Sequence, residues 1–194
     1  MNLPNKLTFL RIFLVPAYMV TALWEFPFHW LVSGLVFGAA ALTDLFDGRI
    51  ARSRGLITNL GKFLDPIADK MITTAAFLVL MEERQMNAWA LLLILTREFA
   101  VTSVRLMAAS DGRVIAANFW GKLKTVSQFV AILFSTAALE FATWETGVLA
   151  GAGLPAAAYS VPLIVGQVLL WIATLLTVGS GIDYVWKNRA YLKA

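Results

Sequence analysis

The sequence predicts an all-α integral membrane protein with six transmembrane helices. Hydrophobic residues make up 59% of its 194 positions and charged residues only 14%, whereas roughly a quarter of residues are charged in an ordinary soluble domain. Residues 26–43 and 146–182 contain no charged side chain, and a spanning helix needs about 20 mostly apolar residues. The chain has no cysteine, which excludes a disulfide framework and a thiolate metal site.

Six apolar stretches give the expected helices in order. Charge-free runs at 12–24, 26–43 and 125–139 predict the first, second and fifth, and the long run at 146–182 holds a sixth helix and a loop. The third and fourth stretches carry charges, which must lie inside the bundle or at an interface. Asp65 before Pro66 is typical of an N-cap and first helical position. The expected spans are 7–24, 29–47, 66–82, 86–109, 119–140 and 161–186, with a short cytoplasmic interfacial helix at 48–60.

The charges are unevenly shared between the two ends of these helices. With six spans both termini lie on one side, and nearly all lysines and arginines fall on that side, whereas the opposite loops hold only Arg84 among cations. The positive-inside rule then places both termini in the cytoplasm. This cationic face suits anionic lipid headgroups, and we expect no nucleic-acid partner. The chain shows no internal repeat, so residues 1–194 are read as a single domain.

Four aspartates at the cytoplasmic end of the second and third helices predict a metal site. Asp44 and Asp47 are three residues apart and Asp65 and Asp69 four apart, so each pair shares a helix face. Four converging carboxylates repel one another unless a cation sits between them. Oxygen ligands suit Mg²⁺ or Mn²⁺, and this number suits two ions. The alternative, in which each aspartate pairs with a nearby arginine or lysine, explains one of them better than all four.

The residues between the two pairs suit a phosphate-bearing ligand. Gly48 allows a close approach to the backbone, Arg52 can bind a phosphate bidentately, and Thr58 or Asn59 can donate hydrogen bonds. Paired divalent ions beside arginine are typical of phosphoryl or phosphatidyl transfer. A divalent-cation transporter could also use a ring of carboxylates, but it has no need of the arginines.

These residues form a pattern that resembles the signature of the CDP-alcohol phosphotransferases. The pattern is Asp44-x2-Asp47-Gly48-x2-Ala51-Arg52-x8-Gly61-x3-Asp65-x3-Asp69, and it agrees with the signature at every fixed position. The resemblance implies six transmembrane helices, a homodimer, and direct transfer from a CDP-activated lipid with release of CMP. It also implies that Asp44, Asp47 and Asp65 bind the metals, that Asp69 is the general base and also counts among the ligands, and that Gly48, Arg52 and Thr58 hold the cytidine diphosphate.

A second cationic set points to the acceptor alcohol. Arg97 lies in the middle of the fourth apolar run, and Arg105 is eight residues further on, about two helical turns away and on the same face. Lys122 and Lys124 begin the fifth helix on the same side. Together they predict a receptor for a dianionic phosphate. Alternatively, Arg97 pairs with Glu98 and the lysines are ordinary cytoplasmic flanks.

A narrower resemblance concerns the segments NLPNKLTFLRI and LTREFAVTSVRLMAASDGRVIAANFWGKLKT. They are similar to the bacterial branch of the family that makes phosphatidylglycerophosphate. The resemblance implies CDP-diacylglycerol as donor and the 1-hydroxyl of sn-glycerol 3-phosphate as acceptor, at the cytoplasmic face of the bacterial inner membrane, with Arg97, Arg105 and Lys124 on the acceptor phosphate. Members that make phosphatidylserine, phosphatidylinositol phosphate or cardiolipin share the signature, and an intramembrane prenyltransferase also uses paired aspartates. No chemistry is assigned to the chain beyond residue 140.

Overall fold

The computed structural model describes residues 3–54, 59–110, 119–144 and 155–189, with the backbone alone at 3–7, 44–54, 59–66, 69 and 109–110. All regular structure in these ranges is helical, α-helical except for a 3-10 position at Arg189. The six helices are α1 (Leu3–Leu23), α2 (His29–Arg54), α3 (Asn59–Glu82), α4 (Ala88–Ser110), α5 (Phe119–Thr143) and α6 (Ala156–Lys187). The all-helical prediction is therefore confirmed.

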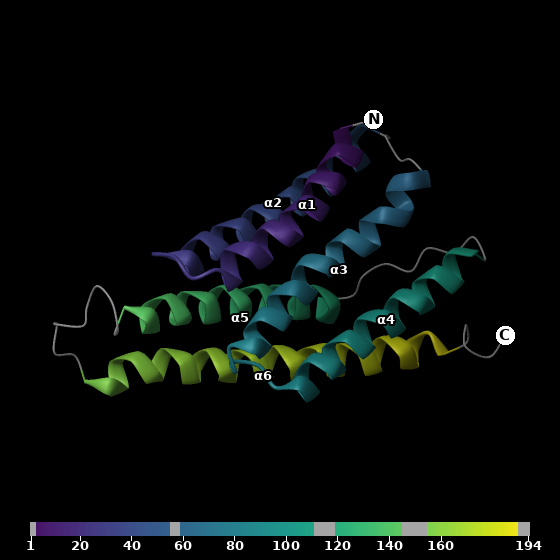
Figure 1. Cartoon of the computed structure of the whole chain (residues 1–194). Helices are drawn as coiled ribbons and strands as arrows, with labels where there is room; N and C mark the ends of the chain where they lie inside the picture. Colours follow the sequence, from purple (N-terminus) through teal and green to yellow (C-terminus); the bar gives the residue numbers. More distant parts are fainter. Residues whose placement is uncertain (1–2, 55–58, 111–118, 145–154, 190–194) are drawn as a thin grey trace.

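The helices run alternately up and down the bundle, so that α1 begins and α6 ends at the same end (Figure 1). α1 packs along α2 and α3, α5 packs along α6, and α4 packs mainly against α6. α2 joins the two halves through its contact with α5. The C-terminal ends of α2 and α4 and the N-terminal ends of α3 and α5 all point toward the end where α1 begins (Figure 1).

The distribution of side chains fits an apolar solvent. Each helix exposes large apolar side chains, among them Phe13, Leu35, Leu78, Leu92, Val126 and Leu175. Polar side chains are instead buried between helices, among them Ser33, Gln128, Ser135, Thr136, Thr174 and Thr177. Within the described ranges, two helices are long and apolar enough to cross a membrane, Phe119–Thr143 and Ala156–Lys187. Lipid removes the cost of exposing hydrocarbon, and buried polar groups can then hold helices together.

Two boundaries differ most from those expected, while α1 and α6 also begin earlier, at Leu3 and Ala156. α2 continues through Gly48 to Arg54, so residues 48–54 belong to α2 and form no separate interfacial helix. One glycine costs a helix only about 1 kcal/mol relative to alanine, too little to end it here. α3 begins at Asn59, so Asp65 is not an N-cap and Pro66 lies within the helix. Proline inside a helix is tolerated in membrane bundles, where neighbouring groups satisfy the freed carbonyl, and α1 and α6 also contain prolines, Pro16 and Pro162.

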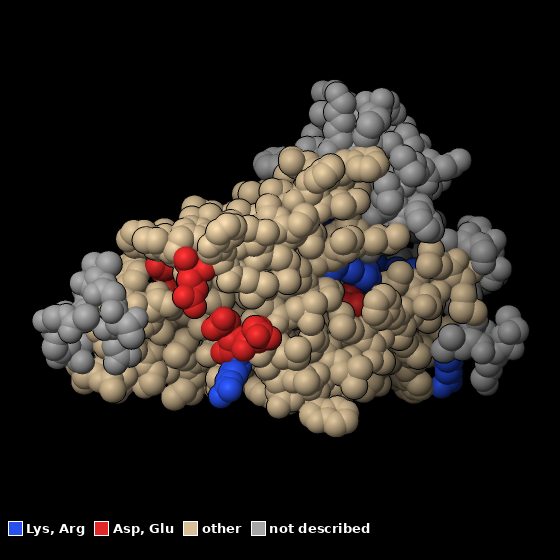
Figure 2. Space-filling view, in the orientation of Figure 1, with Lys and Arg blue, Asp and Glu red and all other residues tan. Residues whose placement is uncertain are grey.

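The opposite end of the bundle is acidic and contains a buried glutamate that joins two helices. Figure 2 shows acidic side chains gathered toward the end of the bundle away from the start of α1. Glu140 of α5 accepts hydrogen bonds from the backbone N–H of Leu31 at 3.0 Å and from Trp144 Nε1 at 2.8 Å. Partial burial raises the pKa of Glu83 against the lowering effect of His29.

Candidate functional site

The four aspartates lie in the helix segments that point toward the end where α1 begins (Figure 1). The last part of α2 holds Asp44, Asp47, Gly48 and Arg52, and the first half of α3 holds Asp65 and Asp69. The spacings of three and four therefore fall within continuous helices, as expected. The side chains of these residues, and all of Thr58, lie outside the described part of the chain, so their metal, base and nucleotide roles stay predictions.

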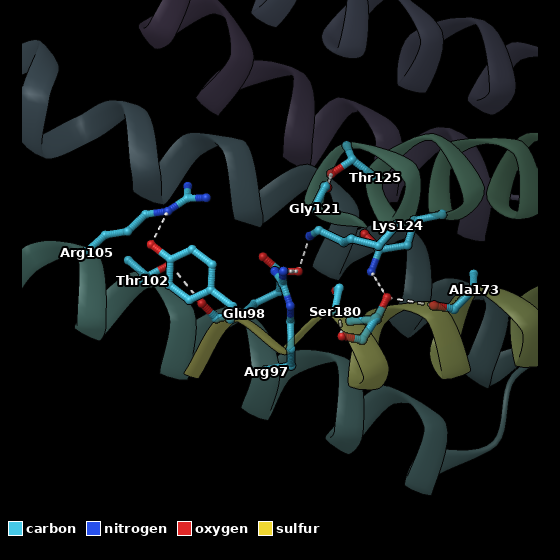
Figure 3. A network of polar contacts seen from close by, with 12 residues as sticks. Arg97, Glu98, Thr102, Arg105, Gly121, Lys124, Thr125, Ala173 and Ser180 are labelled. Carbon is cyan, nitrogen blue, oxygen red and sulfur yellow. Dashed lines mark hydrogen bonds and ion pairs between the residues drawn. The ribbon is translucent and has the colours of Figure 1, made fainter. Parts of the chain in front are cut away.

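A buried ion-pair cluster joins α4 to α5 near this end. Arg97 Nη1 donates to Glu98 Oε1 at 3.2 Å, and Lys124 Nζ donates to the same oxygen (Figure 3). Arg97 is 9% exposed and Lys124 is 8% exposed. Lysine and arginine are almost never buried this deeply unless they are paired. One carboxylate oxygen therefore organises two buried cations from different helices.

A third cation, Arg105, lies about two turns further along the same face of α4 than Arg97. Arg105 Nε donates to the Tyr184 hydroxyl at 3.3 Å, and its guanidinium carbon lies 5.4 Å from the centre of the Tyr184 ring. Tyr184 belongs to α6 and is buried, packed with Val101 and Val104 of α4. The phenol thus holds the Nε edge of Arg105 and leaves its terminal nitrogens for another acceptor.

Helix α6 fits against Arg97 through a glycine. A methyl group at Gly181 would lie 2.3 Å from Arg97 Cγ, 3.4 Å from its Cβ and 3.5 Å from its Cδ. Real carbon contacts lie near 3.5–4.0 Å, so the aliphatic part of Arg97 occupies the space that a side chain at 181 would need. Gly181 therefore sets the path that Arg97 takes between α4 and α6.

A layer of neutral hydrogen bonds lies one turn deeper in the bundle. Gln128, four residues after Lys124 on α5, donates from Nε2 to Thr177 Oγ1 of α6 at 2.9 Å. Thr177 in turn donates to the Ala173 carbonyl at 2.6 Å, and Ser180 donates to the Thr177 carbonyl at 2.9 Å. Bonds of this kind between helices fix their register in a membrane. Of these three bonds, the one from Gln128 to Thr177 joins α5 to α6, whereas the other two lie within α6 and satisfy its hydroxyl groups.

Among the side chains that the structure describes, the cluster has more positive than negative charge. Arg97, Arg105 and Lys124 outnumber Glu98, and the charge of Lys70 on α3 also acts on Glu98 and Lys124. Arg97 Nε is buried and has no hydrogen-bond partner among the described atoms. Arg97 and Lys124 are buried and Arg105 is exposed, so two buried cations share one carboxylate and keep unused donors, an arrangement that can bind a phosphate.

An apolar groove on the lipid-facing side runs along α1, α3 and α4. Its volume is about 700 Å³, and its lining includes Val15, Met19, Met71, Leu78, Phe99 and Leu106. Lys70, which follows Asp69 in α3, also lines it. The groove therefore connects the hydrocarbon surface of the bundle with the part of α3 that contains the aspartates. Its walls suit a hydrocarbon chain.

The expected acceptor set is only partly assembled around one point. Arg97 and Lys124 share Glu98, Arg105 is held beside them by Tyr184, and Lys122 is exposed on α5. The alternative pairing of Arg97 with Glu98 is present, but Lys124 is buried in the same cluster and is not an exposed flank.

Sequence reasoning predicted the sixth helix but missed its part in this cluster, to which α6 contributes Gly181 and Tyr184 from a region where no chemistry was assigned. The available signal was a glycine and a tyrosine three residues apart near the C-terminal end of an apolar helix.

Comparison with known proteins identifies the family. The family model described as CDP-alcohol phosphatidyltransferase matches residues 1–179. A CDP-diacylglycerol–glycerol-3-phosphate 3-phosphatidyltransferase of Bacillus subtilis (strain 168) is 39% identical over 99% of this chain and 97% of its own length. A probable phosphatidylglycerophosphate synthase of Mycobacterium tuberculosis (strain ATCC 25618 / H37Rv) is 38% identical over 95% of this chain and 80% of its own. A CDP-diacylglycerol–glycerol-3-phosphate 3-phosphatidyltransferase of Rickettsia bellii (strain RML369-C) is 34% identical over 98% of this chain and 97% of its own length. The chain therefore belongs to the CDP-alcohol phosphatidyltransferase family.

Proposed function

We propose that this protein transfers the phosphatidyl group of CDP-diacylglycerol to the 1-hydroxyl of sn-glycerol 3-phosphate, forming phosphatidylglycerophosphate and CMP. The names of its full-length relatives support this reaction. The observation in the structure that carries it is the pair of buried cations, Arg97 and Lys124, on one carboxylate. An acceptor that bears its own phosphate needs such a site in addition to the one that holds the pyrophosphate.

The donor half of the reaction belongs to the aspartates of α2 and α3. Asp44, Asp47, Asp65 and Asp69 provide carboxylate oxygens at helical spacings in two helix segments that point toward one end of the bundle, and this donor set suits Mg²⁺ or Mn²⁺. Two such ions, when bound, would neutralise the charge of the pyrophosphate. Gly48, Arg52 and Thr58 would hold the cytidine diphosphate, and the apolar groove beside Lys70 suits an acyl chain of the lipid.

The acceptor half uses Arg97, Arg105 and Lys124 to hold the phosphate of glycerol 3-phosphate. Asp69 takes the proton of the 1-hydroxyl as its oxygen bonds to the phosphorus of the diacylglycerol phosphate. The bond from this phosphorus to the oxygen of CMP then breaks, and CMP leaves with the electron pair. Fixing both substrates converts the encounter into an intramolecular step, which accounts for a large part of the catalysis in reactions of this kind.

The charge distribution supports the proposed orientation in the membrane. The end where α1 begins carries Arg105, Lys122, Lys124 and Lys187, while the opposite end carries Glu25, Glu82 and Glu83. By the positive-inside rule the site faces the cytoplasm of a bacterial cell. We also propose six membrane crossings and a homodimer, as the family resemblance implies.

An acceptor assay tests the proposal. Purified protein in detergent, with CDP-diacylglycerol and Mg²⁺, should release CMP when glycerol 3-phosphate is added. Serine, inositol phosphate and phosphatidylglycerol, tested separately, should give no release. Omitting the acceptor and adding a chelator are the two controls. Release with only one of the other alcohols would contradict the acceptor, and no release with any of the four would contradict the reaction.

A further inference from the structure

We infer that Glu98 is a positioning residue for the acceptor: its carboxylate holds Arg97 and Lys124 together in the geometry that a phosphate monoester needs. The inference rests on the proposed function, because it assumes that these cations bind the acceptor. Neither the family signature nor the relatives' names assign a role to Glu98.

The first argument is geometric. Arg97 and Lys124 donate to the same atom, Glu98 Oε1, although they come from different helices. A lysine has three N–H donors and an arginine five, so one shared oxygen uses only a small part of their capacity. Glu98 therefore fixes where the two cationic groups lie and leaves most of their donors for another anion.

The second argument concerns the cost of burial. The side chains of Arg97 and Lys124 are 8% and 10% exposed, and each charge loses most of its hydration there. Two like charges in such a place repel each other, and removing the partner of a buried ion leaves its charge uncompensated. Without the carboxylate, the ammonium group of Lys124 is more stable in solvent than in its buried position. The two cations would then no longer lie together before the acceptor binds.

The third argument is that Glu98 itself is held in place. Its side chain is 17% exposed, and the hydroxyl of Thr102, one turn further along α4, donates a hydrogen bond of 2.7 Å to the backbone carbonyl of Glu98, which holds the backbone there and not the carboxylate. Two cations contact its carboxylate, Arg97 from the same helix α4 and Lys124 from α5 (Figure 3). The carboxylate of Glu98 therefore links α4 to α5 through its two ion pairs, and these contacts limit its movement when a phosphate binds.

Competition gives the opposite expectation, so the two roles can be separated. If the carboxylate of Glu98 only competed with the acceptor phosphate for Arg97 and Lys124, the variant Glu98→Gln would bind glycerol 3-phosphate more tightly than the wild type. If Glu98 positions the two cations, Glu98→Gln removes the charge that holds them together. The KM for glycerol 3-phosphate then rises about ten-fold or more, which corresponds to about 1.4 kcal/mol of binding. The KM for CDP-diacylglycerol stays within about two-fold, because the lipid binds at α2 and α3. Glu98→Asp keeps the charge on a shorter side chain, and we expect its KM for glycerol 3-phosphate to lie between those of the wild type and Glu98→Gln.

The experiment measures kcat and both KM values for Glu98→Gln, Glu98→Asp and the matched control Glu82→Gln, an exposed glutamate at the other end of the bundle. The double variant with Lys124→Met adds a second readout. If Glu98 acts through Lys124, the effect of Glu98→Gln should shrink well below ten-fold in this background. If it only stabilises the fold, the two effects should multiply and both substrates should be affected alike.

The outcomes are distinguishable. A wild-type protein that does not use glycerol 3-phosphate defeats the proposed function, whatever the variants do. An active wild type with an unchanged or lowered KM in Glu98→Gln defeats only the role of Glu98. If Glu98→Gln does not fold, Glu98→Asp decides: a KM for glycerol 3-phosphate equal to that of the wild type contradicts the inference, and a selective rise supports it.

Discussion

Replacement of Gly181 by alanine tests whether α6 forms one wall of the acceptor site. The new methyl group would lie 2.3 Å from Arg97 Cγ, more than an ångström inside a normal carbon contact. Cγ is in the middle of the side chain and Cβ and Cδ are also in contact, so the whole stem must shift and carry the guanidinium with it. Overpacking of this kind costs about 1–3 kcal/mol.

The expected result is a selective loss of acceptor binding. If the full cost appears when glycerol 3-phosphate binds, its KM rises roughly 5- to 150-fold, and the KM for CDP-diacylglycerol changes little. Gly179→Ala is the matched control, because no atom lies within 4 Å of a methyl group there and both substitutions gain the same helix propensity, about 1 kcal/mol. Steady-state CMP release at varied acceptor concentration measures both. An unchanged KM in Gly181→Ala would refute the idea that this glycine places Arg97.

Three further predictions concern the cations, the base and the opposite end of the bundle. Lys124→Met should raise the KM for glycerol 3-phosphate at least about ten-fold. The control Lys187→Met breaks an exposed ion pair with Asp183 and should change this KM less than about two-fold. Equal effects of the two substitutions would contradict a separate acceptor site. Asp69→Asn should abolish CMP release while binding of CDP-diacylglycerol stays measurable by titration, and full activity would exclude it as the base. Glu140→Ala should lower the free energy of unfolding by roughly 1–3 kcal/mol, because the backbone N–H of Leu31 and the indole of Trp144 lose their acceptor. Chemical unfolding in detergent measures this, and a loss as small as that of Glu82→Ala would contradict the stabilising role of these two hydrogen bonds.

The boundaries of two helices show where local pattern reasoning stops working. The aspartate–proline pair at 65 and 66 has the local features of a helix start, and the glycine at 48 those of a helix end. In the structure both lie within longer helices. Such signals are worth about 1 to 3 kcal/mol each, and packing along a whole helix can outweigh them.

The sequence by itself determined the helical class, the apolar surface and the signature of the family. Composition, the length of apolar runs and spacings of three and four along a helix are local properties, and they need no knowledge of which helices touch. The tertiary structure decided how the acceptor cluster is built. Glu98 joins Lys124 across 26 residues, and Arg105 meets Tyr184 across 79. Such contacts depend on which faces of α4, α5 and α6 pack together, and the spacing of residues within one helix carries no information about the rotation of its neighbour.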